Sequence, residues 1–216
     1  MPCEDLAAAT FAVIDVETTG LDSKADRVVE IACFRVSGGS VVDRFGSLVD
    51  PGCEIPSRAS AIHGIFGRDV AGAPTLACLE PRIRQMTADA VVVAHNARFD
   101  VGFLPFIAER PTLCTLRLAR RLVDAPSYRN RALRDFLRLE LPGRVGPAHR
   151  AEADAEVTAA LLLELLRRYA RGPYPATVPA LLTTAVRSIA LSRFALRKHR
   201  GKMLRQSTGR LSRRLD

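Results

Sequence analysis

The sequence of 216 residues lacks the features that define several classes of protein. Its longest uncharged apolar runs, residues 90–94 and 159–163, fall far short of the roughly 18 residues that a membrane-spanning helix needs. The first residues are acidic where a secretory signal is basic, and no long apolar stretch follows them. The five cysteines are odd in number and form no C-x-x-C pair, which argues against a disulfide framework and a cysteine zinc site. These absences predict a cytoplasmic protein with reduced thiols.

Most of the chain also lacks net charge. Residues 1–171 carry 22 basic and 22 acidic side chains, whereas residues 172–216 carry 10 basic and 1 acidic. The formal net charge of +9 therefore lies entirely in the last part of the chain. The breaker cluster Arg171-Gly172-Pro173-Tyr174-Pro175 coincides with this step. We predict two parts, a domain over residues 1–171 and a basic C-terminal extension over residues 172–216.

The extension has several possible roles. Apolar residues recur at helical spacing over residues 178–198 with arginines between them, which predicts a basic amphipathic helix. Such a segment tracks phosphates, docks a protein partner such as a polymerase through its apolar stripe, or lies on an anionic membrane. We favour nucleic acid first, partner docking second and a membrane last, with a solvated disordered tail as the alternative to all three.

Hydrophobic patterning in the first part predicts a sheet followed by helices. Residues 10–16 are apolar on both strand faces, as in a central strand that is covered on both sides. Residues 27–36 and 40–49 predict two further strands, joined by a Gly-bearing turn that favours an antiparallel hairpin. An irregular stretch with Pro51, Pro56 and Gly64 follows, and residues 90–94 predict a second buried strand. Helices are expected over residues 75–87, 99–109, 116–123, 131–137 and 152–168.

Two acidic residues stand at the end of the most apolar predicted strand. Asp15 and Glu17 are two positions apart, so strand geometry places both carboxylates on the same sheet face, roughly 6 to 7 Å apart. A third acid, Asp100, follows the second buried strand after a short turn. The carboxyl ends of neighbouring strands are where functional groups converge in open α/β sheets. The pair alone fits a solvated strand end, and only the further acids favour a site.

A fourth acid lies on an apolar helix face. Asp154 shares its face with three apolar residues at offsets of 3, 7 and 11, namely Val157, Leu161 and Leu165. A buried ion without a partner is costly, so such a group protonates, pairs with a base or binds a cation. Arg150 is a candidate structural partner. Four acids near the ends of apolar elements nevertheless favour a divalent metal site.

His149 stands where the chain enters this helix, five residues before Asp154. Five residues turn the helix by about 140°, so the two side chains do not form a two-ligand face. Histidine exchanges protons near neutral pH, and this place beside an acidic cluster favours a general base over a ligand. A surface or capping histidine is the alternative.

Three sequence blocks together resemble a known family. They are Asp15-Val16-Glu17-Thr18-Thr19-Gly20, then His95-Asn96-Ala97-Arg98-Phe99-Asp100, then His149 with Asp154 five residues later. In this order and spacing, over residues 10–168, they resemble the DEDDh (DnaQ-like) 3′-to-5′ exonucleases. Residues 62–65 and 112–120 also resemble segments of the bacterial DNA polymerase III epsilon proofreading branch. Cys114 stands where many relatives of that branch have Asp, at a position outside the metal set.

The resemblance implies a two-ion site with assigned residues. Asp15, Glu17, Asp100 and Asp154 would hold two Mg²⁺ or Mn²⁺ ions with Asp15 bridging, and His149 would take a proton from the attacking water. Oxygen ligands suit these hard cations, and two ions about 3.5 to 4 Å apart stabilise both the attacking and the leaving oxygen. The implied substrate contacts are Thr18, Thr19, Leu21, His63 and Asn96, with Leu21 as a wedge against terminal bases. For the others, turn chemistry at Gly20 and helix capping by Asn96 are the alternatives.

The implied fold is an α/β ribonuclease-H-like fold, a mixed five-stranded sheet flanked by helices, with its fifth strand near residues 112–115. The implied enzyme is a metal-dependent 3′-to-5′ exonuclease that releases nucleoside 5′-monophosphates from single-stranded or frayed 3′ ends of DNA in proofreading or repair. An RNA-trimming exoribonuclease is the first alternative, because only a few side chains that contact the 2′-OH tell the two polymers apart. A non-catalytic module that binds nucleic acid or a polymerase is the second, and the presence of all five chemistry-bearing residues argues against it.

Overall fold

The computed structural model describes residues 5–141 and 149–186. Residues up to Ala185 form one compact unit. Most of the predicted basic extension, residues 187–216, and with it the predicted helix beyond residue 186, lies outside the described residues. Among the described helices, none combines the length and the apolar composition that crossing a bilayer requires.

Five strands form one mixed sheet in the order β3-β2-β1-β4-β5. The strands are β1 (Phe11–Thr18), β2 (Val28–Ser37), β3 (Ser40–Leu48), β4 (Val91–Ala94) and β5 (Thr112–Cys114). The first three strands form the predicted antiparallel meander. Strand β4 pairs with β1 in parallel and β5 pairs with β4 in parallel. The mixed five-stranded sheet predicted from the sequence is confirmed, including its short fifth strand.

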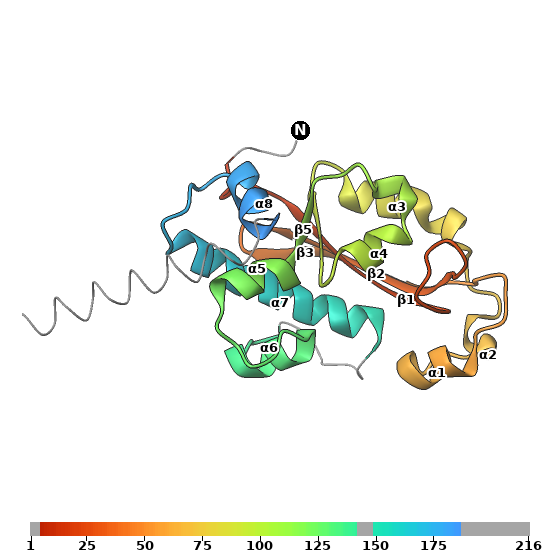
Figure 1. Cartoon of the computed structure of the whole chain (residues 1–216). Coiled ribbons are helices and arrows are strands. Elements are labelled where there is room, and N and C mark those ends of the chain that lie inside the picture. The colour runs from red at the N-terminus through yellow and green to blue at the C-terminus, as the bar shows by residue number, and fades with distance from the viewer. Residues whose placement is uncertain (1–4, 142–148, 187–216) are drawn as a thin grey trace, which may run out of the picture. The chain divides into compact units, whose positions relative to one another are not determined.

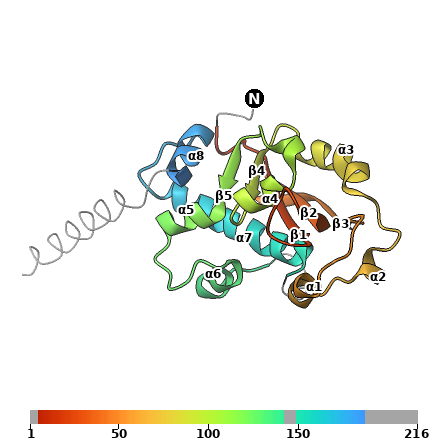
Figure 2. The ribbon, with the colours of Figure 1, turned by 45° about the vertical axis from the view of Figure 1, so that its right-hand side comes forward.

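Helices cover both faces of this sheet (Figure 1). On one face lie α5 (Thr115–Leu122), α6 (Asn130–Leu137), α7 (Ala151–Ala170) and α8 (Val178–Val186). On the other lie α3 (Leu76–Thr87), α4 (Arg98–Gly102) and the 3₁₀ turn η1 (Pro105–Ile107). Two short helices, α1 (Ser57–His63) and α2 (Gly67–Val70), lie near the end of the sheet where β1 ends (Figure 2).

The apolar pattern of β1 explains the two layers. Phe11 and Val13 face the α5–α8 layer and belong to one core cluster. Ile14 and Val16 face the α3–α4 layer and belong to the other. Because successive side chains point to opposite faces, a strand that is apolar at every position must be covered on both sides. This places β1, and the acids at its end, in the middle of the molecule.

Two segments differ from the sequence prediction. The helix expected over residues 99–109 is two pieces, because Pro105 has no N–H to continue α4 and instead starts η1. The stretch expected to be irregular contains α1 and α2. Helix α8 buries Val178, Leu181 and Ala185 in the same cluster as α7. The charge step near residue 171 therefore falls inside the compact unit, and the functional division of the chain there stays a prediction.

Candidate active site

Four acidic side chains converge where β1 ends. Asp15 and Glu17 lie on β1 itself, Asp100 lies on α4 directly after β4, and Asp154 lies in the first turn of α7. Because β1 and β4 are parallel neighbours, their carboxyl ends meet at the same edge of the sheet. Asp100 also contacts β1 directly, since the Val16 N–H donates to its Oδ1 at 3.3 Å. The structure thus brings together all four acids that the sequence singled out.

The acids strongly perturb one another. Burial raises the pKa of Asp15 well above its usual value, and the charges of Asp100, Glu17 and Asp154 raise it further. Burial, then the charges of Asp154 and Glu30, raises the pKa of Glu17 to about 8. Burial raises the pKa of Asp100 to about 7, although the Val16 N–H favours its charged form. Carboxylates in this state ionise readily at neutral pH only when a cation joins them.

Three of the side chains offer a compact donor set. Ligand atoms of Glu17, His149 and Asp154 all lie within 4.8 Å of one another. Carboxylate oxygens dominate the site when Asp15 and Asp100 are added, and such donors suit Mg²⁺ or Mn²⁺ better than soft metals. The residues present therefore fit the divalent cations that the sequence predicted.

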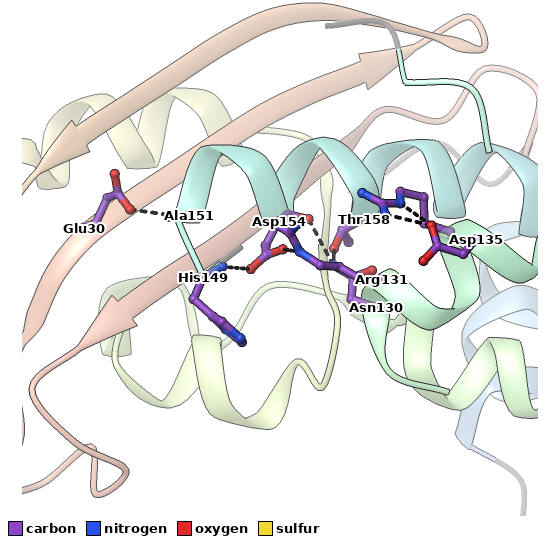
Figure 3. A network of polar contacts seen from close by, with 9 residues as sticks. Glu30, Asn130, Arg131, Asp135, His149, Ala151, Asp154 and Thr158 are labelled. Atoms are coloured by element: carbon purple, nitrogen blue, oxygen red, sulfur yellow. Dashed lines mark hydrogen bonds and ion pairs between the residues drawn. The ribbon is translucent and has the colours of Figure 1, made fainter. Parts of the chain in front are cut away.

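Both oxygens of Asp154 are already hydrogen-bonded by the protein (Figure 3). The His149 backbone N–H donates to Oδ2 at 3.1 Å, and Arg131 Nε donates to Oδ1 at 3.2 Å. The expectation that Arg150 pairs with Asp154 is wrong. Arg150 precedes the helix in an extended conformation and reaches Glu30 on β2 instead. Arg131 lies on α6, and no sequence pattern indicated that it would contact Asp154.

His149 lies just before α7, as the sequence predicted. The residue is exposed, and its ring extends away from the first turn of the helix (Figure 3). Its backbone is in the left-handed region with φ of 56°, which a residue with a Cβ rarely adopts. Tertiary contacts must hold this conformation, and the hydrogen bond to Asp154 is one of them.

Glu30 is a fifth carboxylate that sequence reasoning missed. It lies directly opposite Glu17 in the β1–β2 ladder and is only 6% exposed. Arg150 donates to it through Nε at 3.0 Å and Nη2 at 2.6 Å, and the Ala151 N–H donates at 2.8 Å. The available signal was a single acid within the otherwise apolar run of residues 28–34.

The two threonines proposed as substrate contacts are engaged in a turn. Thr18 donates its hydroxyl to the Gly20 carbonyl at 2.5 Å. Thr19 donates its hydroxyl to Asp26 Oδ1 at 3.2 Å and accepts the Arg27 N–H at 2.9 Å. Gly20 is needed for close approach, because a Cβ there would overlap the Asp26 carboxylate. Both hydroxyls therefore form hydrogen bonds within the turn, as the alternative interpretation expected.

The other three candidate contacts, Leu21, His63 and Asn96, have different local surroundings. Leu21 is 86% exposed at the tip of this turn. His63, at the end of α1, is buried; its Nδ1 accepts the Ile65 N–H at 3.0 Å, while its Nε2 meets no partner among the described residues. Asn96 is exposed and has φ of 73°, and α4 begins after Ala97 without a side-chain cap. Asn96 therefore forms the left-handed turn before α4 and does not cap the helix.

Residues 12–162 match the family model described as Exonuclease. The chain belongs to this family. The epsilon subunit of DNA polymerase III from Aquifex aeolicus is 32% identical over 184 residues, covering 79% of this chain and 89% of that subunit. Among solved structures, Exonuclease X in complex with 5′ overhanging duplex DNA has 34% identity and a TM-score of 0.69, covering 81% of this chain and 99% of that one. The DEDDh (DnaQ-like) assignment is confirmed, and with it a hydrolytic nuclease of the 3′-to-5′ exonuclease type.

Other relatives are much longer than this domain. The chain spans 27% of the length of a relative from Mycobacterium tuberculosis, which is 37% identical over 180 residues. It spans 12% of the PolC-type DNA polymerase III of Thermotoga maritima, which is 36% identical over 168 residues. The exonuclease domain therefore occurs within larger proteins as well as in a chain of similar length.

Proposed function

We propose that this exonuclease removes nucleotides one at a time from the 3′ ends of DNA, with two Mg²⁺ or Mn²⁺ ions held by Asp15, Glu17, Asp100 and Asp154. The convergence of these carboxylates at the end of β1, beside His149, carries the proposal. Buried acids with raised pKa values destabilise the site unless cations complete it. When bound, such ions stabilise the negative charge on the attacking and leaving oxygens of a phosphodiester.

The role of His149 in this proposal is to take a proton from water. The imidazole is exposed at the edge of the acidic cluster, so both water and a strand end have access to it. Oxygen of that water forms a bond to the terminal phosphorus while the bond from phosphorus to the 3′ oxygen breaks. The products are a nucleoside 5′-monophosphate and a strand that is shorter by one nucleotide with a new 3′-hydroxyl.

The neighbouring residues fit a single-stranded end. Thr18 and Thr19 stabilise the turn that presents the exposed Leu21, which supports a contact between this leucine and terminal bases. The His63 Nε2 and the exposed Asn96 are polar groups for the last nucleotide. In this proposal the last nucleotide lies unpaired among these groups.

DNA is the favoured polymer because Exonuclease X, at 34% identity, was solved with duplex DNA that has a 5′ overhang. Likeness to the epsilon subunit supports a role in proofreading or repair, with a polymerase as a partner.

The proposed location is the cytoplasm. Attraction of nucleic acid or of a partner is assigned to the basic residues 187–216, which lie outside the described residues.

Digestion of matched single-stranded DNA and RNA oligonucleotides in Mn²⁺ tests the polymer preference. We expect DNA to be shortened at least about tenfold faster than RNA, and equal or faster RNA turnover would overturn the preference. The His149→Ala variant should lose most of the activity, while Asp43→Asn, which changes a half-exposed acid on β3, should retain it. Equal digestion by wild type and His149→Ala would show that His149 is not the general base.

A further inference from the structure

Two glutamates face each other beside the metal site. Glu17 and Glu30 are direct partners in the antiparallel β1–β2 ladder. Like charges in this arrangement repel, and Glu30 contributes to the raised pKa of both Glu17 and Asp15.

The contacts of Glu30 leave its carboxylate little capacity to bind a metal ion. Arg150 Nε donates to both of its oxygens at 3.0 Å, Arg150 Nη2 donates to Oε1 at 2.6 Å, and the Ala151 N–H donates to Oε2 at 2.8 Å. A carboxylate has about four lone-pair positions, and these donors occupy most of them. Bidentate bonds from arginine are also the strongest and most directional of such contacts. The carboxylate of Glu30 is therefore engaged by hydrogen bonds from the protein itself. Its partner Arg150 lies 120 residues later in the chain.

These partners directly follow His149. Asp154 accepts the His149 N–H, while Glu30 holds the Arg150 side chain and the Ala151 N–H. The backbone of His149 thus lies between two carboxylate anchors that come from different elements (Figure 3). Its left-handed φ of 56° is unfavourable for a histidine and persists only where the surroundings determine it.

We propose that Glu30 is a positioning residue for His149: through Arg150 and the Ala151 N–H it fixes the left-handed backbone of His149, so that the imidazole faces the attacking water. The proposal rests on the proposed function for the role of His149 in turnover. It distinguishes the two facing glutamates, because Glu17 binds a cation from solution whereas Glu30 binds a cation from the chain.

Kinetics of two variants test this role. Glu30→Gln should lower kcat on single-stranded DNA by about 10- to 100-fold, while KM and the Kd for Mn²⁺ measured calorimetrically without DNA change by less than about threefold. Glu156→Gln is the matched control, because Glu156 is 4% exposed, lies on α7 and pairs with Arg44. This control should leave kcat within about twofold of wild type. A Kd for Mn²⁺ that weakens more than about tenfold in Glu30→Gln would make Glu30 a ligand and overturn the proposal.

A double-mutant cycle tests whether Glu30 acts through Arg150. Replacing either residue by Gln should cost similar activity, and the double variant should lose little more than the worse single variant. Arg150→Lys, which keeps the charge on a partly exposed side chain, should recover part of the activity that Arg150→Gln loses. Multiplicative losses in the double variant would show independent roles and contradict the proposal.

Amide hydrogen exchange gives a readout that does not depend on activity. Glu30→Gln should speed exchange of the amides of residues 149–151 by at least about tenfold relative to Glu156→Gln. Unchanged exchange there would overturn the positioning role even if the enzyme digests DNA. If these amides exchange faster in Glu30→Gln while the wild type shows no nuclease activity, the positioning role of Glu30 stands and the proposed function is refuted.

Discussion

Glu17 and Glu30 are cross-strand neighbours on β1 and β2, and among the described residues a cationic side chain forms an ion pair with Glu30 alone of the two. Arg150 donates to Glu30 at 2.6 Å, whereas the pKa of Glu17 rises to about 8 in spite of the same arginine. The two acids lie on adjacent strands, and the Arg150 guanidinium is oriented toward Glu30. We propose that this difference leaves Glu17 dependent on a cation from outside the chain.

The stability of the metal-free protein should depend on the protonation of Glu17. Its pKa is about 8 in the fold against an ordinary value of 4.5, so the folded state retains a proton that the unfolded state releases. Stability from this group is therefore full below pH 4.5 and is lost as pH rises to about 8, with a limiting slope of about 1.4 kcal/mol per pH unit. Urea unfolding of wild type and Glu17→Gln in EDTA at pH 5 to 8 measures this. The advantage of the variant should grow with pH, and parallel curves would contradict the shift.

Binding of Mn²⁺ should release protons near neutral pH. Glu17 and Asp100, with pKa values of about 8 and about 7, must both be ionised to bind a cation. Calorimetric titration at pH 7 in two buffers with different ionisation enthalpies counts the released protons. We expect about one proton or more for each occupied site, fewer in Glu17→Gln, and a buffer-independent enthalpy would refute the raised pKa values.

The acids of the site could be predicted from sequence because local periodicity decides their faces. The period of two in β1 joined Asp15 to Glu17, and the helical period placed Asp154 beside the core residues of α7. The partners of these acids could not be predicted in the same way. Arg131 meets Asp154 from α6, and Arg150 meets Glu30 across 120 residues, so both pairs depend on how separate elements pack.

The remaining differences also have local physical causes. Helices α1 and α2 are short and lie among prolines and glycines, which hide a helical period. Helix α8 follows a breaker cluster, yet Leu181 is completely buried against the α7 layer. A change in sequence composition therefore did not mark a change in packing at residue 171.

Arg131→Gln should tighten the binding of Mn²⁺. Arg131 Nε occupies Oδ1 of Asp154, and a cation at this carboxylate must compete with the guanidinium. A hydrogen bond to a charged group contributes roughly 1.5–3 kcal/mol, so its removal should lower the Kd by about 10- to 100-fold. Arg134→Gln is the control, since Arg134 pairs with Asp135 on the same helix. Weaker Mn²⁺ binding in Arg131→Gln would mean that the arginine organises the ligand instead of competing for it.

Two truncations should behave differently. Ending the chain at residue 186 removes all 10 basic residues of the extension and should leave cleavage of short oligonucleotides intact while weakening binding to long strands at low salt. Ending it at residue 171 also removes Val178 and Leu181 from the core, which should lower the unfolding free energy by at least about 2 kcal/mol. Salt-titrated DNA binding and urea unfolding measure the two effects. Equal stability of both truncations would contradict the packing of α8, and unchanged salt dependence would exclude a DNA-binding extension.

The most direct test of the account is the digestion of a 5′-labelled single-stranded DNA oligonucleotide by wild type and by Asp15→Asn in Mg²⁺ or Mn²⁺. Wild type should produce a ladder that shortens from the 3′ end, with nucleoside 5′-monophosphates as the other product. Asp15→Asn should be slower by more than about 100-fold, although removal of this buried charge should make the metal-free protein more stable. Equal digestion by both proteins, or release of the label as a mononucleotide at the earliest times, would contradict a metal-dependent 3′-to-5′ exonuclease.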